Sequence, residues 1–193
     1  VAESAGGCDD VERYPELKED GRLAIRVRAS VGIENSASIE SKTERLKEIA
    51  NHPARKPDPW VRIVGVKTFL DGGMLNGTAY MRQPWPPGPT YQIVEKDYRG
   101  LLFVPLEQVK IIAEEGAKRK WSVTAHCAGE GAMDVLLDAY EFVDRITPIK
   151  DLRFCITHAN FPSLENLKRC QRLGVCADVQ PIWLYKDGTT LFK

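Results

Sequence analysis

The sequence predicts an α/β protein in which parallel strands alternate with helices. Apolar strand-like runs alternate with amphipathic helical stretches along most of the 193 residues, which favours a parallel sheet with crossover helices. His126 and His158 end two successive strand-like runs and lie 32 residues apart, the length of one βα unit. Five such strands fit either an open doubly wound sheet or part of an eight-stranded barrel. Because no GxGxxG or Walker pattern follows a strand, the sequence counts against nucleotide-binding versions.

The first half of the chain contains two predicted strands and one predicted helix. Residues 1–20 are polar and acidic without a clear period, so we expect a loop or the remnant of an element. Residues 22–31 alternate apolar and charged side chains, and residues 60–70 form a β-rich apolar run, so both predict strands. Residues 41–50 predict a helix, with Ser41 as a candidate N-cap.

Residues 74–104 have a different character from the segments around them. They carry four prolines and several aromatic residues with no period. A long irregular stretch within a compact domain is usually a functional loop or lid, or else disordered. Pro105 then suits the first turn of a helix that continues to Ala117.

The second half contains three predicted strands separated by helices. The strands are the run ending at His126, the run ending at His158, and residues 175–184, with Pro181 near the end of the last. Residues 132–143 carry the clearest amphipathic helical pattern in the chain. A second helix is expected from a Ser163 cap to a Gly174 stop.

Composition excludes several classes of partner and location. Lys plus Arg number 27 and Asp plus Glu number 27, without a basic stripe, so we expect no nucleic-acid partner. The apolar runs are too short to cross a membrane, and the N-terminus does not resemble a signal peptide. The five cysteines include no CxxC pair, so we expect reduced thiols and a cytoplasmic protein.

Three polar residues fall near the predicted carboxyl ends of strands, where active sites of parallel sheets gather: Lys67, His126 and His158. Imidazole suits zinc and related divalent ions. Either histidine taken alone would more often be a core or surface residue, but their shared position on successive strands favours a ligand role. A buried Lys67 ammonium is costly. A lowered pKa, an ion pair with Asp71, snorkelling or conversion to an anionic carbamate would each relieve that cost. Glu130 reads as a helix N-terminal charge rather than a catalytic base.

Four ordered blocks resemble amidohydrolase family 3, a branch of the metal-dependent amidohydrolase superfamily. Residues 66–79 are similar to its "VK-x-x-x-DG…TA" signature, and residues 124–132 to its "HAIGDRA" segment. Residues 153–159 resemble "R-x-x-IEHA", and residues 175–181 resemble "GV-x-x-x-xQP". Together the blocks cover residues 22–185.

The resemblance implies a (β/α)8 TIM barrel with one or two divalent metals, usually zinc. It implies hydrolysis of amide or other C–N bonds in a small-molecule substrate, an activity of EC 3.5 type, through metal-activated water. Lys67, carbamylated or not, would match the strand-four lysine, and His126 and His158 the next two metal ligands. Asp71 and Glu130 are expected next to these ligands or in the substrate loop.

The sequence also departs from the family pattern. It has three histidines and no HxH pair, and no Asp stands in the context of strand eight. Glu130 replaces the family's Asp, and Thr157 replaces its Glu. We therefore expect residues 1–193 to be a single partial barrel domain, a central fragment of about strands three to seven.

Such a fragment holds three of six expected metal-site residues, so we expect it to bind metal weakly or not at all and to be inactive alone. The alternative is a non-catalytic barrel fragment that acts as a binding or assembly module. In either case, the open edges of a partial barrel invite homo-oligomers.

Overall fold

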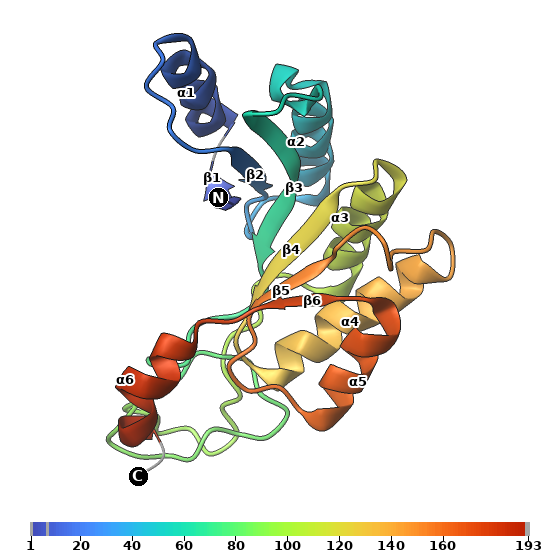
Figure 1. Cartoon of the computed structure of the whole chain (residues 1–193). Helices are drawn as coiled ribbons and strands as arrows, with labels where there is room; N and C mark the ends of the chain where they lie inside the picture. The colour runs from blue at the N-terminus through green and yellow to red at the C-terminus, as the bar shows by residue number, and fades with distance from the viewer. Residues whose placement is uncertain (1, 7, 192–193) are drawn as a thin grey trace.

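A computed structural model describes residues 2–6 and 8–191, which form one sheet with a layer of helices (Figure 1). The strands are β1 (Ala2–Gly6), β2 (Val27–Gly32), β3 (Val61–Phe69), β4 (Ser122–Cys127), β5 (Cys155–His158) and β6 (Cys176–Asp178). The helices are α1 (Cys8–Glu19), α2 (Ile39–Asn51), the 3-10 helix η1 (Pro53–Arg55), α3 (Leu106–Lys118), α4 (Glu130–Asp144), α5 (Leu164–Leu173) and α6 (Pro181–Leu191).

All six strands are parallel and follow one another in chain order, β1-β2-β3-β4-β5-β6. Helices α2 to α5 lie side by side along one face of the sheet (Figure 1). The core fills the space between this face and the helices, with Leu46, Ile112, Leu136 and Ile156 among its buried side chains. The predicted α/β class, with parallel strands alternating with helices, is confirmed.

The N-terminal segment corrects one expectation. Residues 1–20 were expected to be a loop or a remnant, yet they contain β1 and α1, and β1 pairs in parallel with β2. Pro15 lies inside α1, and proline within a helix is a signal against helix in a sequence. Val11 of α1 is fully buried, so tertiary packing supports this helix.

Two helix starts also differ from expectation. Ser38, rather than Ser41, caps α2: its side-chain oxygen accepts a hydrogen bond from the Ser41 backbone N–H at 3.2 Å. The last predicted strand is only three residues long, because Pro181 begins α6. Proline at the first helical position sacrifices no helical hydrogen bond. Ser163 and Gly174 bound α5 as predicted, with Gly174 at φ 69°.

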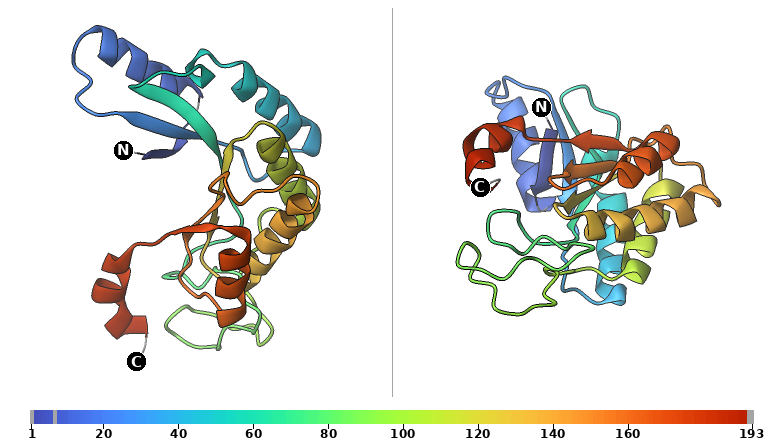
Figure 2. Two further views of the ribbon diagram at one scale, coloured as in Figure 1. Left: turned by 45° about the vertical axis from the view of Figure 1, so that its right-hand side comes forward. Right: turned by 90° about the horizontal axis from the view of Figure 1, so that it is seen from below.

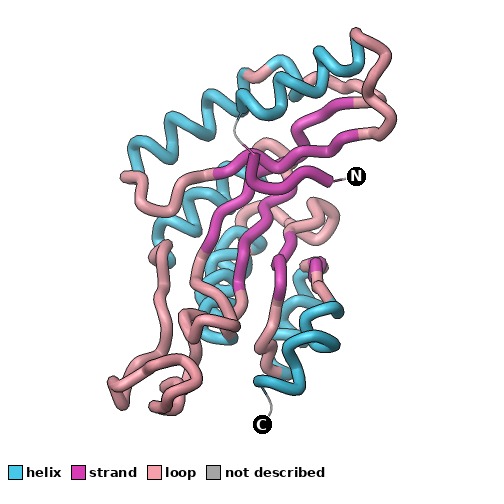
Figure 3. Tube along the Cα trace, turned by 90° about the vertical axis from the view of Figure 1, so that its left-hand side faces the viewer, coloured by secondary structure: helices cyan, strands magenta, loops and turns pink. Residues whose placement is uncertain are grey.

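The segment between β3 and α3 is a long irregular connection with its own small core. Ala79 and Trp85 of this segment are buried against Ala128, which follows β4, and the Trp85 indole N–H donates to the Ala79 carbonyl at 2.8 Å. Arg82 fixes this segment to α4 through two 2.6 Å bonds from its guanidinium to the Asp134 carboxylate. Figure 3 shows the segment extending beyond the ends of the strands. Its role as a lid remains a proposal.

Helix α6 stands apart from the helix layer. It follows β6 and lies near the long connection, on the side of the sheet where the strands end, in both views of Figure 2. Among the described residues, no helix has the length and apolar character needed to span a bilayer.

Candidate functional site

The predicted site residues lie on three adjacent strands. Lys67 is near the end of β3, His126 near the end of β4, and His158 is the last residue of β5. In the parallel ladders Lys67 aligns with Thr124, and His126 aligns with Thr157. The structure therefore brings the two histidines together at one end of the sheet, with ring centroids 4.5 Å apart and ring planes at 74°.

The backbone at His158 turns its side chain. In register, His158 aligns with Cys127, which is fully buried on the helix-facing side, rather than with His126. Regular alternation would direct His158 toward the helices as well. Instead His158 has φ 82° and Ala159 has φ 48°. This left-handed backbone is uncommon outside glycine and clusters at functional sites, and here it brings the imidazole to the His126 ring.

Each imidazole has one nitrogen engaged by the protein. The Nε2 atom of His126 lies 2.8 Å from the Gly72 carbonyl oxygen. A carbonyl can only accept, so Nε2 carries the proton and Nδ1 has the lone pair. That Nδ1 atom is buried and has no hydrogen-bond partner among the described residues. The Nδ1 atom of His158 lies 2.6 Å from Oε1 of Gln180, which leaves its Nε2 available.

Burial lowers the pKa of both imidazoles. For His126, the bond to Gly72 opposes this shift in pKa and the positive charge of Lys67 reinforces it. For His158, the bond to Gln180 opposes the shift in pKa, while His126 and Lys67 reinforce it. This lowering of the pKa favours the neutral form of both rings, the form in which histidine is a metal ligand.

Lys67 is 7% exposed, and burial lowers the pKa of its ammonium group. The negative charge of Asp178 opposes that shift in pKa. Its Nζ atom lies 5.1 Å from the centroid of the Phe69 ring, a cation–π distance. Among the described residues, Lys67 makes no ion pair, so the pairing with Asp71 that the sequence left open is not formed.

Asp71 is occupied by backbone groups instead. Its Oδ1 accepts from Ala128 N at 2.9 Å, while its Oδ2 accepts from Gly129 N at 2.8 Å and from Tyr80 N at 2.9 Å. Burial raises the pKa of Asp71 to about 6, against the effect of these three N–H donors. Because Oδ1 is also 3.5 Å from Nε2 of His126, Asp71 connects the long connection, the start of α4 and the His126 ring.

Glu130 occupies the first position of α4. A carboxylate there is favoured by the partial positive charge of the helix N-terminus. Within the described chain, no hydrogen bond or ion pair joins Glu130 to Lys67 or to either histidine.

Two residues of the site were missed by the sequence reasoning. Gln180 contacts His158 as described above, and the Trp183 ring lies against the His158 ring at 4.9 Å between centroids, tilted by 30°. The signal for Gln180 was its place just beyond the last strand, in the "QP" part of the quoted block. Trp183 carried no such signal, since it lies in a helix that the sequence did not predict.

Two cavities lie next to the histidines, with volumes of about 290 and 230 Å³. Met74, Asn160 and Trp183 line both of them, His158 lines the larger and His126 the smaller. Most other lining groups of the larger cavity are apolar, including Phe161 and Pro162. An apolar cavity of about 150 Å³ can hold a benzene ring, so each has room for part of a small organic molecule.

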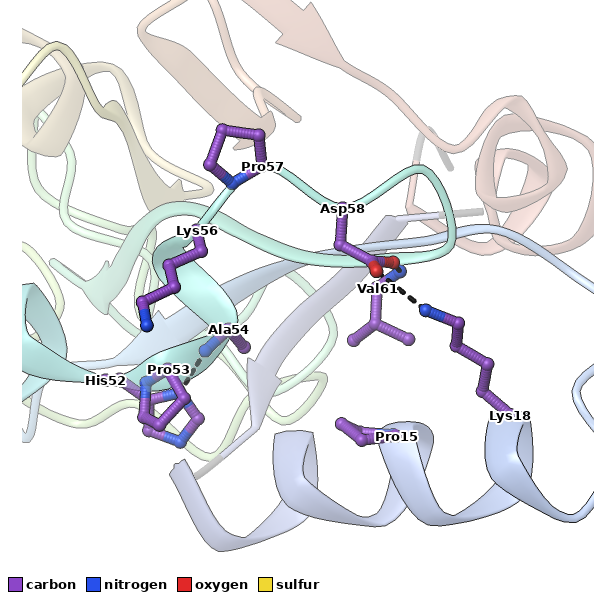
Figure 4. Close-up of a pocket in the computed structure, with 9 residues that line it drawn as sticks. All are labelled: Pro15, Lys18, His52, Pro53, Ala54, Lys56, Pro57, Asp58 and Val61. Carbon is purple, nitrogen blue, oxygen red and sulfur yellow. Dashed lines mark hydrogen bonds and ion pairs between the residues drawn. The ribbon is translucent and has the colours of Figure 1, made fainter.

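A cavity of about 410 Å³ lies elsewhere, between α1, η1 and the first residue of β3 (Figure 4). Lys18 and Asp58 form an ion pair of 2.7 Å at its rim. It is larger than the two cavities by the histidines, but it sits at the amino end of β3 and none of the predicted site residues lines it. Because active sites of parallel sheets lie at carboxyl strand ends, we place the candidate site at the histidines.

Comparison with known proteins identifies the family. The protein-family model for amidohydrolase family 3, described as "Amidohydrolase family", matches residues 1–192 of this chain.

The chain belongs to the amidohydrolase family.

Solved relatives support this membership. The chain is 25% identical to an uncharacterized metal-dependent hydrolase from Pyrococcus furiosus, with a TM-score of 0.75 over 97% of this chain and 35% of that one. A corresponding hydrolase from Pyrococcus horikoshii gives 25% identity and a TM-score of 0.76 over 97% and 34% of the two chains. The predicted resemblance is thereby confirmed, and so is the prediction of a partial barrel.

A curated plant protein is also related. "Protein LONG AFTER FAR-RED 3" of Arabidopsis thaliana is 29% identical over 134 residues, which are 69% of this chain and 22% of that protein. The chain thus spans about a third of the length of the two solved hydrolases and less of the plant protein.

The site has side chains of the type that bind the metal of an amidohydrolase, but it has too few of them for a complete metal site. His126 and His158 each direct one outer N–H at an oxygen acceptor and keep a second nitrogen with a lone pair, the arrangement typical of metal-ligating histidines. However, no group of three or more His, Cys, Asp or Glu side chains in the described ranges could hold a metal ion. Lys67 becomes an oxygen donor only as a carbamate.

The cysteines near the site differ in accessibility, which predicts their reactivity. Cys127 is buried, Cys155 is half-buried and Cys176 is exposed. Burial raises the pKa of Cys155 to about 11 and that of Cys127 well above its usual range, and only thiolates react rapidly. At pH 8 we expect iodoacetamide to modify Cys176 first, as measured by peptide mass spectrometry.

The same reaction in urea is the control for this order, because unfolding should equalise the three rates. Modification of folded Cys155 as fast as Cys176 would contradict the burial of Cys155 between its neighbours.

Proposed function

We propose that this chain carries part of the metal centre of a metal-dependent hydrolase that acts on C–N bonds of a small-molecule substrate. His126 would bind a divalent ion, most simply zinc, through Nδ1, and His158 would bind it through Nε2. Lys67, as a carbamate, would supply the third ligand. Family membership and the relatedness to metal-dependent hydrolases support the class of reaction.

The observation that carries the proposal is the pair of adjoining imidazoles, each with one nitrogen next to a protein oxygen. Their rings lie 4.5 Å apart between centroids, and one nitrogen of each is fixed as a donor to a protein oxygen. The remaining nitrogen of His126 is a buried polar atom without a partner, and an unsatisfied buried group of this kind costs about 1–3 kcal/mol. A cation at the lone pair would remove that cost.

The chain's own residues would bind and orient the reactants. The Gly72 carbonyl and Gln180 hold the two rings in place, and the cavities lined by Met74 and Trp183 would take the apolar part of a substrate. A divalent ion held by these residues would supply a nucleophilic water near neutral pH and Lewis-acid polarisation of the substrate carbonyl.

Calorimetric titration of the metal-free chain with zinc tests this proposal. We expect weak binding, well short of the about 10–16 kcal/mol of a complete structural zinc site, because the chain offers few donors. His126→Asn and His158→Asn should each abolish it. His52→Asn is the matched control, since His52 lies in the cavity of Figure 4 and asparagine can replace its cap of η1.

Titration with zinc in the presence of added bicarbonate tests whether Lys67 acts as a carbamate ligand. Bicarbonate should strengthen zinc binding by the wild-type chain, because carbamate formation consumes carbon dioxide, and it should have no effect on Lys67→Met. Tight zinc binding without bicarbonate would contradict a partial site, and unchanged binding by both histidine variants would overturn the assignment of the ligands.

A second candidate is a non-catalytic module that acts through binding or assembly. It is favoured by the shortage of metal donors in the described residues and by exposed apolar side chains near the β6 side of the sheet. These side chains are Leu164, Leu167, Val179, Ile182, Leu184 and Tyr185. Sedimentation equilibrium discriminates the two candidates: a stable oligomer without zinc binding supports the module, and a zinc-binding monomer supports the hydrolase.

A further inference from the structure

Gln180 lies in the short connection between β6 and α6, and its side chain joins two parts of the site. Its Oε1 is 2.6 Å from Nδ1 of His158. Its Nε2 donates to the backbone oxygen of Asp178 at 3.1 Å and approaches Oδ1 of the same residue at 3.5 Å. The amide group thus stands between the end of β6 and the imidazole at the end of β5.

The surroundings of Gln180 decide which way its amide faces. The backbone oxygen of Asp178 can only accept a hydrogen bond, and its carboxylate accepts when ionised. The NH₂ group of Gln180 must therefore face Asp178, and the amide oxygen must face His158. Since that oxygen is an acceptor, Nδ1 of His158 has to be the donor.

This arrangement fixes the proton on the ring. A neutral imidazole carries one N–H, so a proton on Nδ1 leaves the lone pair on Nε2. Free histidine in water favours the opposite tautomer, with the proton on Nε2. The protein must therefore stabilise the Nδ1–H form of His158, and Gln180 is the group that contacts Nδ1.

The ring is also held on a second side. Trp183, three residues after Gln180, lies against the His158 ring at 4.9 Å between centroids. The two contacts come from Gln180, just before α6, and from Trp183 in its first turn, so one short segment sets both the tautomer and the plane of the imidazole. His126 shows the complementary state, because the Gly72 carbonyl selects the Nε2–H form there.

We propose that Gln180 is a positioning residue that holds His158 in the Nδ1–H tautomer, so that Nε2 is presented as the lone-pair nitrogen at the end of the sheet. The consequence for metal binding rests on the proposed function, but the tautomer itself does not. Gln180 also lines the larger cavity, but the role proposed here is exerted on His158, through the bond between Oε1 and Nδ1.

The test is a long-range ¹H–¹⁵N correlation spectrum of the three histidine rings in the metal-free chain at pH 8. The wild-type spectrum should show Nδ1–H for His158 and Nε2–H for His126. Gln180→Leu, which keeps the size of the side chain but removes the acceptor, should shift His158 to the Nε2–H form. Gln180→Glu keeps an acceptor and should retain Nδ1–H.

His126 provides the internal control. If Gln180→Leu changes only His158, the effect is local, and a change in both rings would point to general loss of the site and would overturn a specific role. Ile182→Ala, at an exposed position of α6 that lines neither cavity, should leave both tautomers unchanged. Should Gln180→Leu fail to fold, the wild-type and Gln180→Glu spectra still decide, because an Nε2–H form of His158 in either one contradicts the proposal.

Zinc titration of the same variants separates this proposal from the proposed function. Gln180→Leu should weaken zinc binding by about tenfold or more, and Gln180→Glu should retain most of it, since loss of such an outer partner typically costs about 10–100-fold. If the tautomers change as expected but wild-type His158 does not bind zinc, Gln180 keeps its role and the metal proposal fails.

Discussion

Replacement of Asp71 with asparagine is expected to lower the free energy of unfolding by about 3 kcal/mol, because a buried N–H donor left without an acceptor costs about 1–3 kcal/mol, and more near a charged group. The Asp71 carboxylate is 1% exposed and accepts backbone hydrogen bonds from Tyr80, Ala128 and Gly129. An asparagine can present an oxygen to only one side of this group of donors. Its NH₂ group would then face an N–H on the other side.

Urea unfolding of the two proteins at pH 7.5 measures this difference. Asp97→Asn is the matched control, since Asp97 lies in the same irregular connection but is exposed, and surface changes of this kind stay within about 0.5 kcal/mol. If Asp71→Asn also stays within that range, the carboxylate does not hold the connection to α4.

Replacement of Gly129 with alanine is expected to lower the free energy of unfolding by about 3 kcal/mol, the upper end of the usual range for overpacking. A Cβ atom at this position would lie 2.0 Å from the carbonyl oxygen and 2.6 Å from the carbonyl carbon of Tyr80. Both are backbone atoms, so no side chain can rotate away. The same Tyr80 oxygen accepts from Ala132 N at 3.2 Å, and we expect this bond to break.

Gly88→Ala is the control for Gly129→Ala, because a Cβ at Gly88 would have no neighbour within 4 Å. Urea unfolding gives the change in stability, and hydrogen exchange at the Ala132 amide reports whether the long connection has left the start of α4. Equal stability of the two alanine variants, with slow exchange at Ala132, would contradict the close packing at this junction.

The strands that carry the site could be predicted because their signal is local. β3, β4 and β5 are apolar runs that end close to Lys67, His126 and His158, so a parallel sheet places these residues at one end. The amphipathic pattern of α4 is equally local, since its buried residues recur along one face of the helix. The fold class and the proximity of the two histidines could therefore be predicted from the periodicity of the sequence and the topology of a parallel sheet.

The parts that sequence reasoning missed depend on tertiary contacts. α1 contains Pro15 and few apolar residues, and β1 exists through its pairing with β2. The left-handed backbone at His158 could not be predicted, because only glycine marks such a conformation reliably in a sequence. Gln180 reaches His158 across 22 positions of sequence, past a strand of only three residues, and a pairwise contact of that kind cannot be inferred from a pattern.

The proposed metal site requires the strand-end histidines to bind a divalent ion through particular nitrogens, Nδ1 of His126 and Nε2 of His158. The direct measurement is a ¹⁵N spectrum of the three histidine rings during zinc addition at high protein concentration, where weak binding is visible. We expect zinc to shift Nδ1 of His126 and Nε2 of His158 most strongly and to leave both nitrogens of His52 unchanged. Larger shifts at Nε2 of His126 or at Nδ1 of His158 than at the other nitrogen of the same ring, or no shift at either ring, would contradict this assignment.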